Sequence, residues 1–165
     1  MSASRICQTL HEEHQATVAF TEQLEAALAK YHSRRPDCAD PALAGVLRGL
    51  PLALDAELSR HFDFEETRLF SHLASAGDAA IGAHLTDEHE AMRPLGARLV
   101  ILSRQALTDG FDDARWQEFR AAAAELCERL LMHVQKEEMA LLPLLEETLD
   151  PESDARLYDD YVGNA

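Results

Sequence analysis

Two stretches of the sequence carry the same residues that can bind a metal, at the same spacing. "RHFDFEETRLFSHL" begins at residue 60 and "MHVQKEEMALLPLL" begins at residue 132, and each contains a histidine followed four residues later by a glutamate. On a helix this spacing places both side chains on one face. An imidazole and a carboxylate on one face are a common pair of metal ligands, so each stretch is a candidate binding segment.

The repetition extends beyond these two stretches. "LHEEHQA", which begins at residue 10, aligns with "LTDEHEA", which begins at residue 85, and each brings one further histidine. The sequence therefore predicts two copies of a helical hairpin related by a pseudo-twofold axis, with matched residues placed symmetrically about it. The matched pairs are His14 with His89, His61 with His133, Glu65 with Glu137, and Glu66 with Glu138.

Long helices must position these residues, because strand signals are nearly absent and apolar residues recur at helical spacing. Short links between long helices make neighbours antiparallel, so the fold class we predict is an all-α, up-down four-helix bundle. We assign this bundle to residues 1–149 and a tail with room for one short helix to residues 150–165. The stretches "RRPDCADP", "SAGD" and "TDGFDD" break the pattern and divide the bundle into helices at 4–32, 42–74, 78–107 and 113–147.

Three prolines fall inside these predicted helices. A proline lacks the N–H group that a helix interior uses and its ring clashes with the preceding turn. We therefore expect kinks, breaks or helix ends at Pro51, Pro94 and Pro143.

The four histidines are expected to point toward the core of the bundle. Apolar residues lie one or two turns from each of them, and the nearest apolar shell consists of Leu10, Leu58, Leu85 and Leu130. Glu65 and Glu137 lie on the same faces, and no lysine or arginine recurs there to neutralise them. Burying such carboxylates alone costs on the order of several kcal/mol each, so bound metal ions are expected to supply the positive charge. Without metal, we expect some of these carboxylates to take up a proton.

The types of ligand limit which metal is expected. Imidazole and carboxylate donors suit iron, and zinc or manganese less well. Six residues exceed the ligand set of one tetrahedral zinc ion, whereas two metal ions bridged by carboxylates would use all of them. The ferritin-type di-iron bundles carry Glu-x-x-His pairs, which are absent around His14 and His89. The sequence therefore favours a histidine-rich dimetal site.

The segments "HEEH", "HFDFEE", "DEHE" and "HVQKEE" resemble the four ligand segments of the hemerythrin-like, or HHE cation-binding, family over about residues 10–145. This resemblance implies a cofactor of two iron ions in an oxo- or hydroxo-bridged non-haem centre, which binds O2, NO or peroxide. It also implies that the carboxylates of Glu65 and Glu137 bridge the metals. Carried over position by position, the metal ligands would be His14, His61, Glu65, His89, His133 and Glu137.

The sequence departs from the oxygen-carrying members of that family at two positions. The carriers have a fifth histidine four residues before the one that matches His89, where this chain has Leu85, so His84 is left as an alternative fifth ligand. On the fourth helix Glu138 has the carriers' carboxylate spacing and is the alternative to Glu137. A centre with fewer imidazoles favours redox chemistry with peroxide, or iron handling, over reversible oxygen carriage.

The leading functional hypothesis is a di-iron protein that binds or senses O2, NO or peroxide. The alternatives are a peroxide-decomposing or iron-handling protein, and a bundle whose metals are purely structural; whether the protein is an enzyme stays open. Members of the family that repair iron–sulfur clusters carry an additional N-terminal domain with a cysteine. We do not expect that domain, because the first ligand is already residue 14.

The remaining polar residues are given structural interpretations. His11 is expected at the rim of the site, His72 at the end of the bundle, and His32 near a helix C-terminus, where it favours the helix dipole. Cys7 is expected to be a core thiol. The acidic residues beside the histidines of the first and third helices are interpreted as solvated helix faces; they are Glu12, Glu13, Asp87 and Glu88.

The composition excludes several classes of partner. The chain has 165 residues, of which 47% are apolar, and a formal net charge of −15. This charge argues against nucleic acid and against an anionic membrane as partners, since both attract positive surfaces. We find no apolar run that could serve as a signal peptide or membrane span, and the three cysteines form no CxxC, so we expect a cytoplasmic protein with reduced thiols. A protein partner or an oligomer is left open.

Overall fold

The computed structural model describes residues 4–163. Within this range the chain is all-α, and its helices begin and end within a few residues of the predicted boundaries. The first rod of the bundle is α1 (Arg5–Lys30), and the second consists of α2 (Pro41–Leu54), η1 (Asp55–His61), α3 (Phe62–Phe64), η2 (Glu65–Leu69) and α4 (Phe70–Ser75). The third rod is α5 (Ala80–Asp109), and the fourth consists of α6 (Asp113–Lys136), η3 (Glu137–Leu141) and α7 (Leu142–Thr148). A final short helix, α8, follows (Pro151–Gly163).

Side-chain caps and glycines set the ends of the rods. Ser4, Asp40 and Asp112 each accept a hydrogen bond from a backbone N–H in the first turn of the helix that follows. Gly77 and Gly110 have positive φ angles of 98° and 75° in the links on either side of α5, a conformation that glycine adopts without strain. These local signals explain why the breaks predicted from the sequence fall where the helices end.

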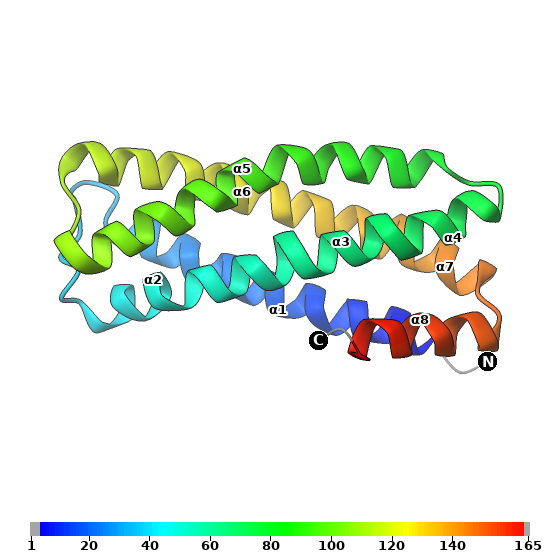
Figure 1. Ribbon diagram of the computed structural model, residues 1–165. Helices are drawn as coiled ribbons and strands as arrows, with labels where there is room; N and C mark the ends of the chain where they lie inside the picture. The colour runs from blue at the N-terminus through cyan, green and yellow to red at the C-terminus, as the bar shows by residue number, and fades with distance from the viewer. Residues whose placement is uncertain (1–3, 164–165) are drawn as a thin grey trace.

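The four rods form an antiparallel ring (Figure 1), in which each rod contacts the one before it and the one after it, and α1 closes the ring against α6. The three prolines lie within helices and do not end them. Pro94 lies inside α5, which continues as a single helix over 30 residues, and Pro51 lies inside α2. Pro143 follows the first residue of α7, so none of the three ends a helix.

Three short segments of the second and fourth rods, η1, η2 and η3, are π-helical. Two of them match across the internal repeat, because η2 starts at Glu65 and η3 starts at Glu137. A π-helical turn widens the helix by one residue and often marks a functional site. The repeat is not followed at η1, since the segment of the fourth rod that matches it is α-helical.

Two apolar clusters fill the bundle. The larger cluster contains Trp116 and Phe119 near the links 31–40 and 110–112, and the smaller one contains Leu73 and Leu145 near the opposite end. Along each rod the candidate ligands lie between residues of the two clusters. Within the described residues, none of the helices has both the length and the apolar character needed to cross a membrane.

The final helix, α8, lies alongside the start of α1 (Figure 1). Its Asp154 accepts hydrogen bonds from the Ser4 hydroxyl and from the backbone N–H groups of Arg5 and Ile6, at 2.6–3.0 Å. Because unpaired N–H groups at a helix start favour an acidic partner, this contact explains why the tail folds back onto the bundle. The assignment of 1–149 and 150–165 to a bundle and a tail stays a prediction.

Candidate metal centre

Six side chains from the four rods meet in the middle of the bundle, and each is at most 1% exposed. They form two groups that could each hold a metal ion, and Glu65 and Glu137 belong to both groups. The first group consists of His14, His61, Glu65 and Glu137, and the second consists of Glu65, His89, His133 and Glu137. The structure therefore brings together all six residues that the sequence predicted as ligands.

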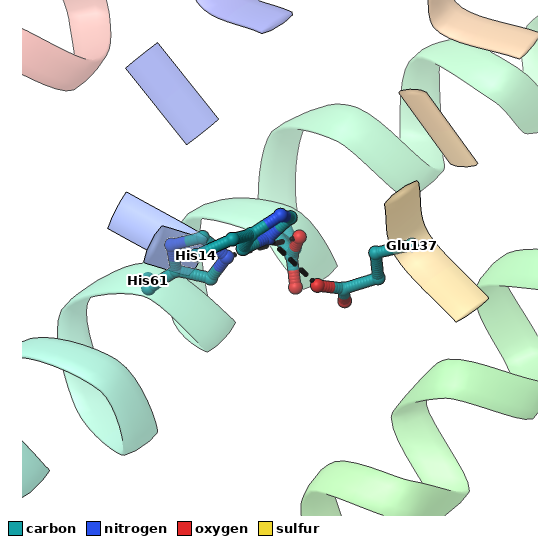
Figure 2. Close-up of side chains that lie close together, drawn as sticks. His14, His61 and Glu137 are labelled. Carbon is teal, nitrogen blue, oxygen red and sulfur yellow. Dashed lines mark ion pairs between the residues drawn. The ribbon is translucent and has the colours of Figure 1, made fainter. Parts of the chain in front are cut away.

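Each of the two shared carboxylates has one oxygen in each group. Glu65 Oε1 lies 3.2 Å from His61 Nε2, and Glu65 Oε2 lies 3.3 Å from His89 Nε2. Glu137 Oε2 lies 2.9 Å from His14 Nε2, and Glu137 Oε1 lies 2.8 Å from His133 Nε2. Figure 2 shows Glu137 pointing toward His14 and His61, whose rings are 5.3 Å apart. This is the arrangement that two metal ions bridged by two carboxylates would need.

A second set of four carboxylates contacts the other ring nitrogen of each histidine. The Nδ1 atoms lie 2.5–2.9 Å from carboxylate oxygens that belong to a neighbouring rod. The outer carboxylates also follow the repeat, because Glu13 matches Glu88 and Glu66 matches Glu138. The four contacts join His14 to Glu138, His61 to Glu13, His89 to Glu66, and His133 to Glu88.

These outer contacts determine which way each imidazole faces. A carboxylate only accepts, so each Nδ1 is assigned the N–H group, and a neutral ring then turns the lone pair of its Nε2 inward. Four nitrogen and four oxygen acceptors thus converge in a buried space. His89 Nε2 and His133 Nε2 are only 3.0 Å apart. The Nε2 atoms of His14 and His61 each lie within ion-pair distance of an oxygen of Glu137 or Glu65. Among the described residues, neither these nitrogen atoms nor the oxygens of the two glutamates have a hydrogen-bond partner. Buried acceptors of this kind fit cations.

The electrostatics at Glu137 run against the proton uptake that was expected for some of the core carboxylates without metal. Burial disfavours a charged Glu137, but the imidazoles of His133 and His14, 2.8 and 2.9 Å from its oxygens, outweigh burial and hold the pKa of this carboxyl well below its ordinary value. Glu137 is therefore ionised rather than protonated. Burial likewise opposes protonation of His133, yet its contacts with Glu137 raise its pKa to about 9. Between these two residues, the shifts favour a proton on the His133 imidazole rather than on the Glu137 carboxyl.

The two halves of the site differ in what holds the outer carboxylates. Glu13 accepts hydrogen bonds from the Tyr161 hydroxyl of α8 and from Arg60, at 3.3 Å for the latter. Its repeat counterpart Glu88 is instead paired with Lys136. The Arg60 guanidinium also lies over the Tyr161 ring, 4.7 Å from its centroid. The pseudo-twofold symmetry of the inner residues is therefore broken one layer outward.

The alternative ligands lie outside the two groups. The His84 side chain is 60% exposed and lies 3.3 Å from Glu88 at the surface, so the unbroken helix α5 does not turn it inward. Glu138 contacts His14 Nδ1 and His11 Nδ1 from outside the site. His11 is exposed, in keeping with a rim position.

Two residues were misinterpreted at the sequence level. Glu13 and Glu88 were expected to be solvated helix faces, but both contact the Nδ1 atom of a candidate ligand. The repeat contained the missing signal, because a glutamate precedes the histidine in both the first and the third rod. Cys7 is a buried core thiol as expected, and burial raises its pKa to about 11.

Comparison with protein-family models gives a match over most of the bundle. A family model described as the hemerythrin HHE cation binding domain matches residues 5–145, which is more than half of the chain. None of the curated proteins matches the chain. The matched region begins with α1, contains all six candidate metal ligands, and ends within α7. The helix α8 therefore lies outside it.

Proposed function

The chain belongs to the hemerythrin HHE cation-binding family, and from this premise we propose that its buried groups hold two iron ions and bind O2, NO or peroxide. Glu65 and Glu137 would bridge the two ions. One ion would be held in addition by His14 and His61, and the other by His89 and His133.

The convergence of eight acceptor atoms is the observation that carries this proposal. Each half offers two imidazole nitrogens and two carboxylate oxygens, which is a mixed donor set that iron accepts. Iron prefers more than four ligands, so a coordination position would remain for a small molecule in each half. A pair of iron ions in such a site supplies the redox chemistry, while the protein residues hold the ions, exclude bulk water and fix the imidazoles.

Zinc provides the competing interpretation. Four protein ligands complete the tetrahedral coordination of a structural zinc ion, and a zinc-loaded bundle would have no position left for a small molecule. Metal identity therefore separates a protein that binds O2, NO or peroxide from a bundle with purely structural metals. An iron-handling role is separated by whether the bound iron exchanges with a chelator.

The first prediction concerns metal content. Protein loaded anaerobically with ferrous iron is expected to contain about two iron ions per chain by elemental analysis. His14→Ala and His89→Ala, which match across the repeat, are expected to lose about one equivalent each. His84→Ala serves as the control and should keep both, because His84 is exposed.

Optical spectra before and after addition of O2, NO and H2O2 then test ligand binding. New absorption bands with at least one of these molecules support the proposal. A ratio of one iron per chain, zinc bound in preference to supplied iron, or spectra unchanged by all three molecules would contradict it.

A further inference from the structure

The helix α8 lies outside the residues that the family model matches, yet one of its side chains reaches the candidate metal centre. Tyr161 is 2% exposed, and its hydroxyl donates a hydrogen bond to Glu13. The acceptor is Glu13 Oε2, which is the same atom that lies 2.9 Å from His61 Nδ1. Two hydrogen bonds in series thus connect α8 to His61, a candidate ligand of the first metal group.

The corresponding carboxylate of the second metal group is held in another way. Glu88 is the repeat counterpart of Glu13, and its Oε2 atom contacts His133 Nδ1. Its Oε1 atom pairs with Lys136, which lies on the same rod as His133. Residues of the bundle therefore hold Glu88, whereas Glu13 receives a hydrogen bond from a helix that follows the bundle.

Arg60 also contacts Glu13, but it does not take the place of Tyr161. Its guanidinium lies 3.3 Å from Glu13 Oε1, and both side chains are partly exposed, 40% for Arg60 and 31% for Glu13. Such ion pairs hold a side chain weakly, because water competes with them and two long side chains must be ordered. Burial raises the pKa of Tyr161 well above its ordinary value, so its phenol keeps its proton and donates to Oε2, the oxygen that contacts His61.

Contacts elsewhere on α8 hold Tyr161 in this place. Asp154 accepts hydrogen bonds from the start of α1, and Asp160 lies 3.2 Å from Arg68 of the second rod. The Tyr161 ring packs on Phe64 of the same rod, 4.4 Å away between ring centroids. Asp154 and Tyr161 are seven residues apart, so both lie on the face of α8 that meets the bundle. The docked helix therefore delivers the hydroxyl to Glu13 in a fixed position.

We propose that Tyr161 is a positioning residue for the first metal group, and that docking of α8 strengthens metal binding there. Through Glu13, Tyr161 holds the His61 imidazole with its Nε2 atom turned toward the group. A metal ion in the first group must in turn stabilise the docked α8, because coupling between two equilibria is reciprocal. The inference rests on the metal-binding part of the proposed function, and it requires neither iron nor a reaction with O2, NO or peroxide.

Zinc affinity in variants that keep one metal group tests the proposal. His89→Ala disrupts the second group and leaves the first, whereas His14→Ala leaves the second. Tyr161→Phe removes only the hydroxyl, and in the His89→Ala protein it is expected to weaken zinc binding about three- to tenfold, the loss that follows from one hydrogen bond. In the His14→Ala protein the same substitution should change the affinity less than about twofold. Competition with a chromophoric chelator measures each affinity.

Tyr158→Phe is the matched control. Tyr158 lies on the same helix, but its ring contacts the Arg5 guanidinium, 3.8 Å from the ring centroid, at the start of α1. Removing its hydroxyl should leave the zinc affinity of both single-group proteins within about twofold. Equal weakening of both groups by Tyr161→Phe would show that Tyr161 only stabilises the fold. An unchanged affinity in the His89→Ala protein would refute the positioning role.

Hydrogen exchange keeps the proposal testable if a double variant fails to fold. When zinc is added to chelated protein with all its ligands, amide exchange in residues 157–163 is expected to slow about three- to tenfold, the factor that reciprocity requires. The slowing should persist in Tyr158→Phe and fall below about twofold in Tyr161→Phe. Exchange in α8 that is the same with and without zinc would overturn the coupling.

The outcomes also separate this proposal from the proposed function. A selective loss of zinc affinity in the first group, in a protein whose iron-loaded form responds to none of O2, NO and H2O2, would retain the role of Tyr161 and refute the proposed function. A response to one of these molecules, with a zinc affinity that Tyr161→Phe does not change, would do the reverse. A protein that bound no zinc and no iron would contradict both.

Discussion

Each candidate ligand histidine contacts a carboxylate of a neighbouring rod through its Nδ1 atom, and this has a consequence for metal affinity. The outer carboxylate fixes the tautomer and increases the electron density on the imidazole, which strengthens its bond to a metal. Hydrogen bonds from the histidines also lower the pKa of Glu138, against the effect of burial, and the same holds for Glu88, where Lys136 contributes as well. Glu138 and Glu88 therefore stay charged at neutral pH.

Replacing an outer carboxylate should weaken metal binding without removing a ligand. Glu138→Gln and Glu66→Gln match across the repeat, so both are expected to keep two metal ions and to lower the affinity by about 10- to 100-fold. Competition with a chromophoric chelator measures the affinity, and Glu12→Gln is an exposed control expected to have no effect. If Glu138→Gln instead lost a full equivalent of metal, Glu138 would be a ligand and our assignment of Glu137 would be incorrect.

The inner residues could be predicted from their spacing along one helix, whereas the contacts of the outer residues depend on how the rods pack. His61 and Glu65 lie on one helix, where the spacing of four residues alone brings them together. The partner of His61 Nδ1 is Glu13, which belongs to another rod, so this contact depends on how far one rod is shifted along the other.

The helices themselves were predictable because capping residues and glycines mark their ends, whereas the π-helical segments were not. Nothing in the residues of η2 distinguishes it from an ordinary helix. The widened turns depend on packing, and they occur where Glu65 and Glu137 enter the crowded centre of the bundle. Their matched positions agree with the functional role that such turns often have.

The second rod and α5 approach closely at Gly96, and this contact gives a testable prediction. A Cβ atom added at Gly96 would lie 2.1 Å from Leu58 Cδ1, so Gly96→Ala must displace a core leucine and is expected to destabilise the fold by about 1–3 kcal/mol. Gly49→Ala in α2 meets nothing within 4 Å and should stabilise the fold by up to about 1 kcal/mol. Denaturation with urea measures both. Equal effects of the two substitutions would mean that the rods do not approach as closely as described.

The helix α8 contacts the candidate metal site through Tyr161. Tyr161 of α8 is buried, packs 4.4 Å from the Phe64 ring between centroids, and donates to Glu13, which contacts His61. A short helix in the tail was expected from the sequence. The contact of Tyr161 with the site was not, because it requires the tail to fold back along α1, a tertiary event that no local pattern encodes. The region outside the family match thus supports one half of the site.

Protons and metal ions compete for the same imidazoles, so stability should depend on pH in opposite ways with and without metal. The pKa of His133 rises from an ordinary 6.5 to about 9, and the pKa values of His61 and His14 are also raised: burial opposes protonation of each, but glutamate contacts outweigh it. The raised pKa values of these histidines stabilise the folded protein. Their contribution is complete below about pH 6.5 and is lost as the pH rises through about 9. The lowered pKa of Glu137 adds stability above its ordinary 4.5 that is lost on acidification.

Chelated protein is therefore expected to melt at its highest temperature near pH 5–6.5 and on the order of 5 °C lower at pH 9. Metal binding requires deprotonated imidazoles, so the increase in melting temperature on adding iron should be small at pH 5.5 and should grow toward pH 9. Melting curves at pH 5.5, 7.5 and 9, with and without chelator, measure both trends. Chelated protein that melted higher at pH 9 than at pH 5.5 would show that the buried imidazoles do not hold protons. An iron-induced increase that did not change with pH would show that they do not bind the metal.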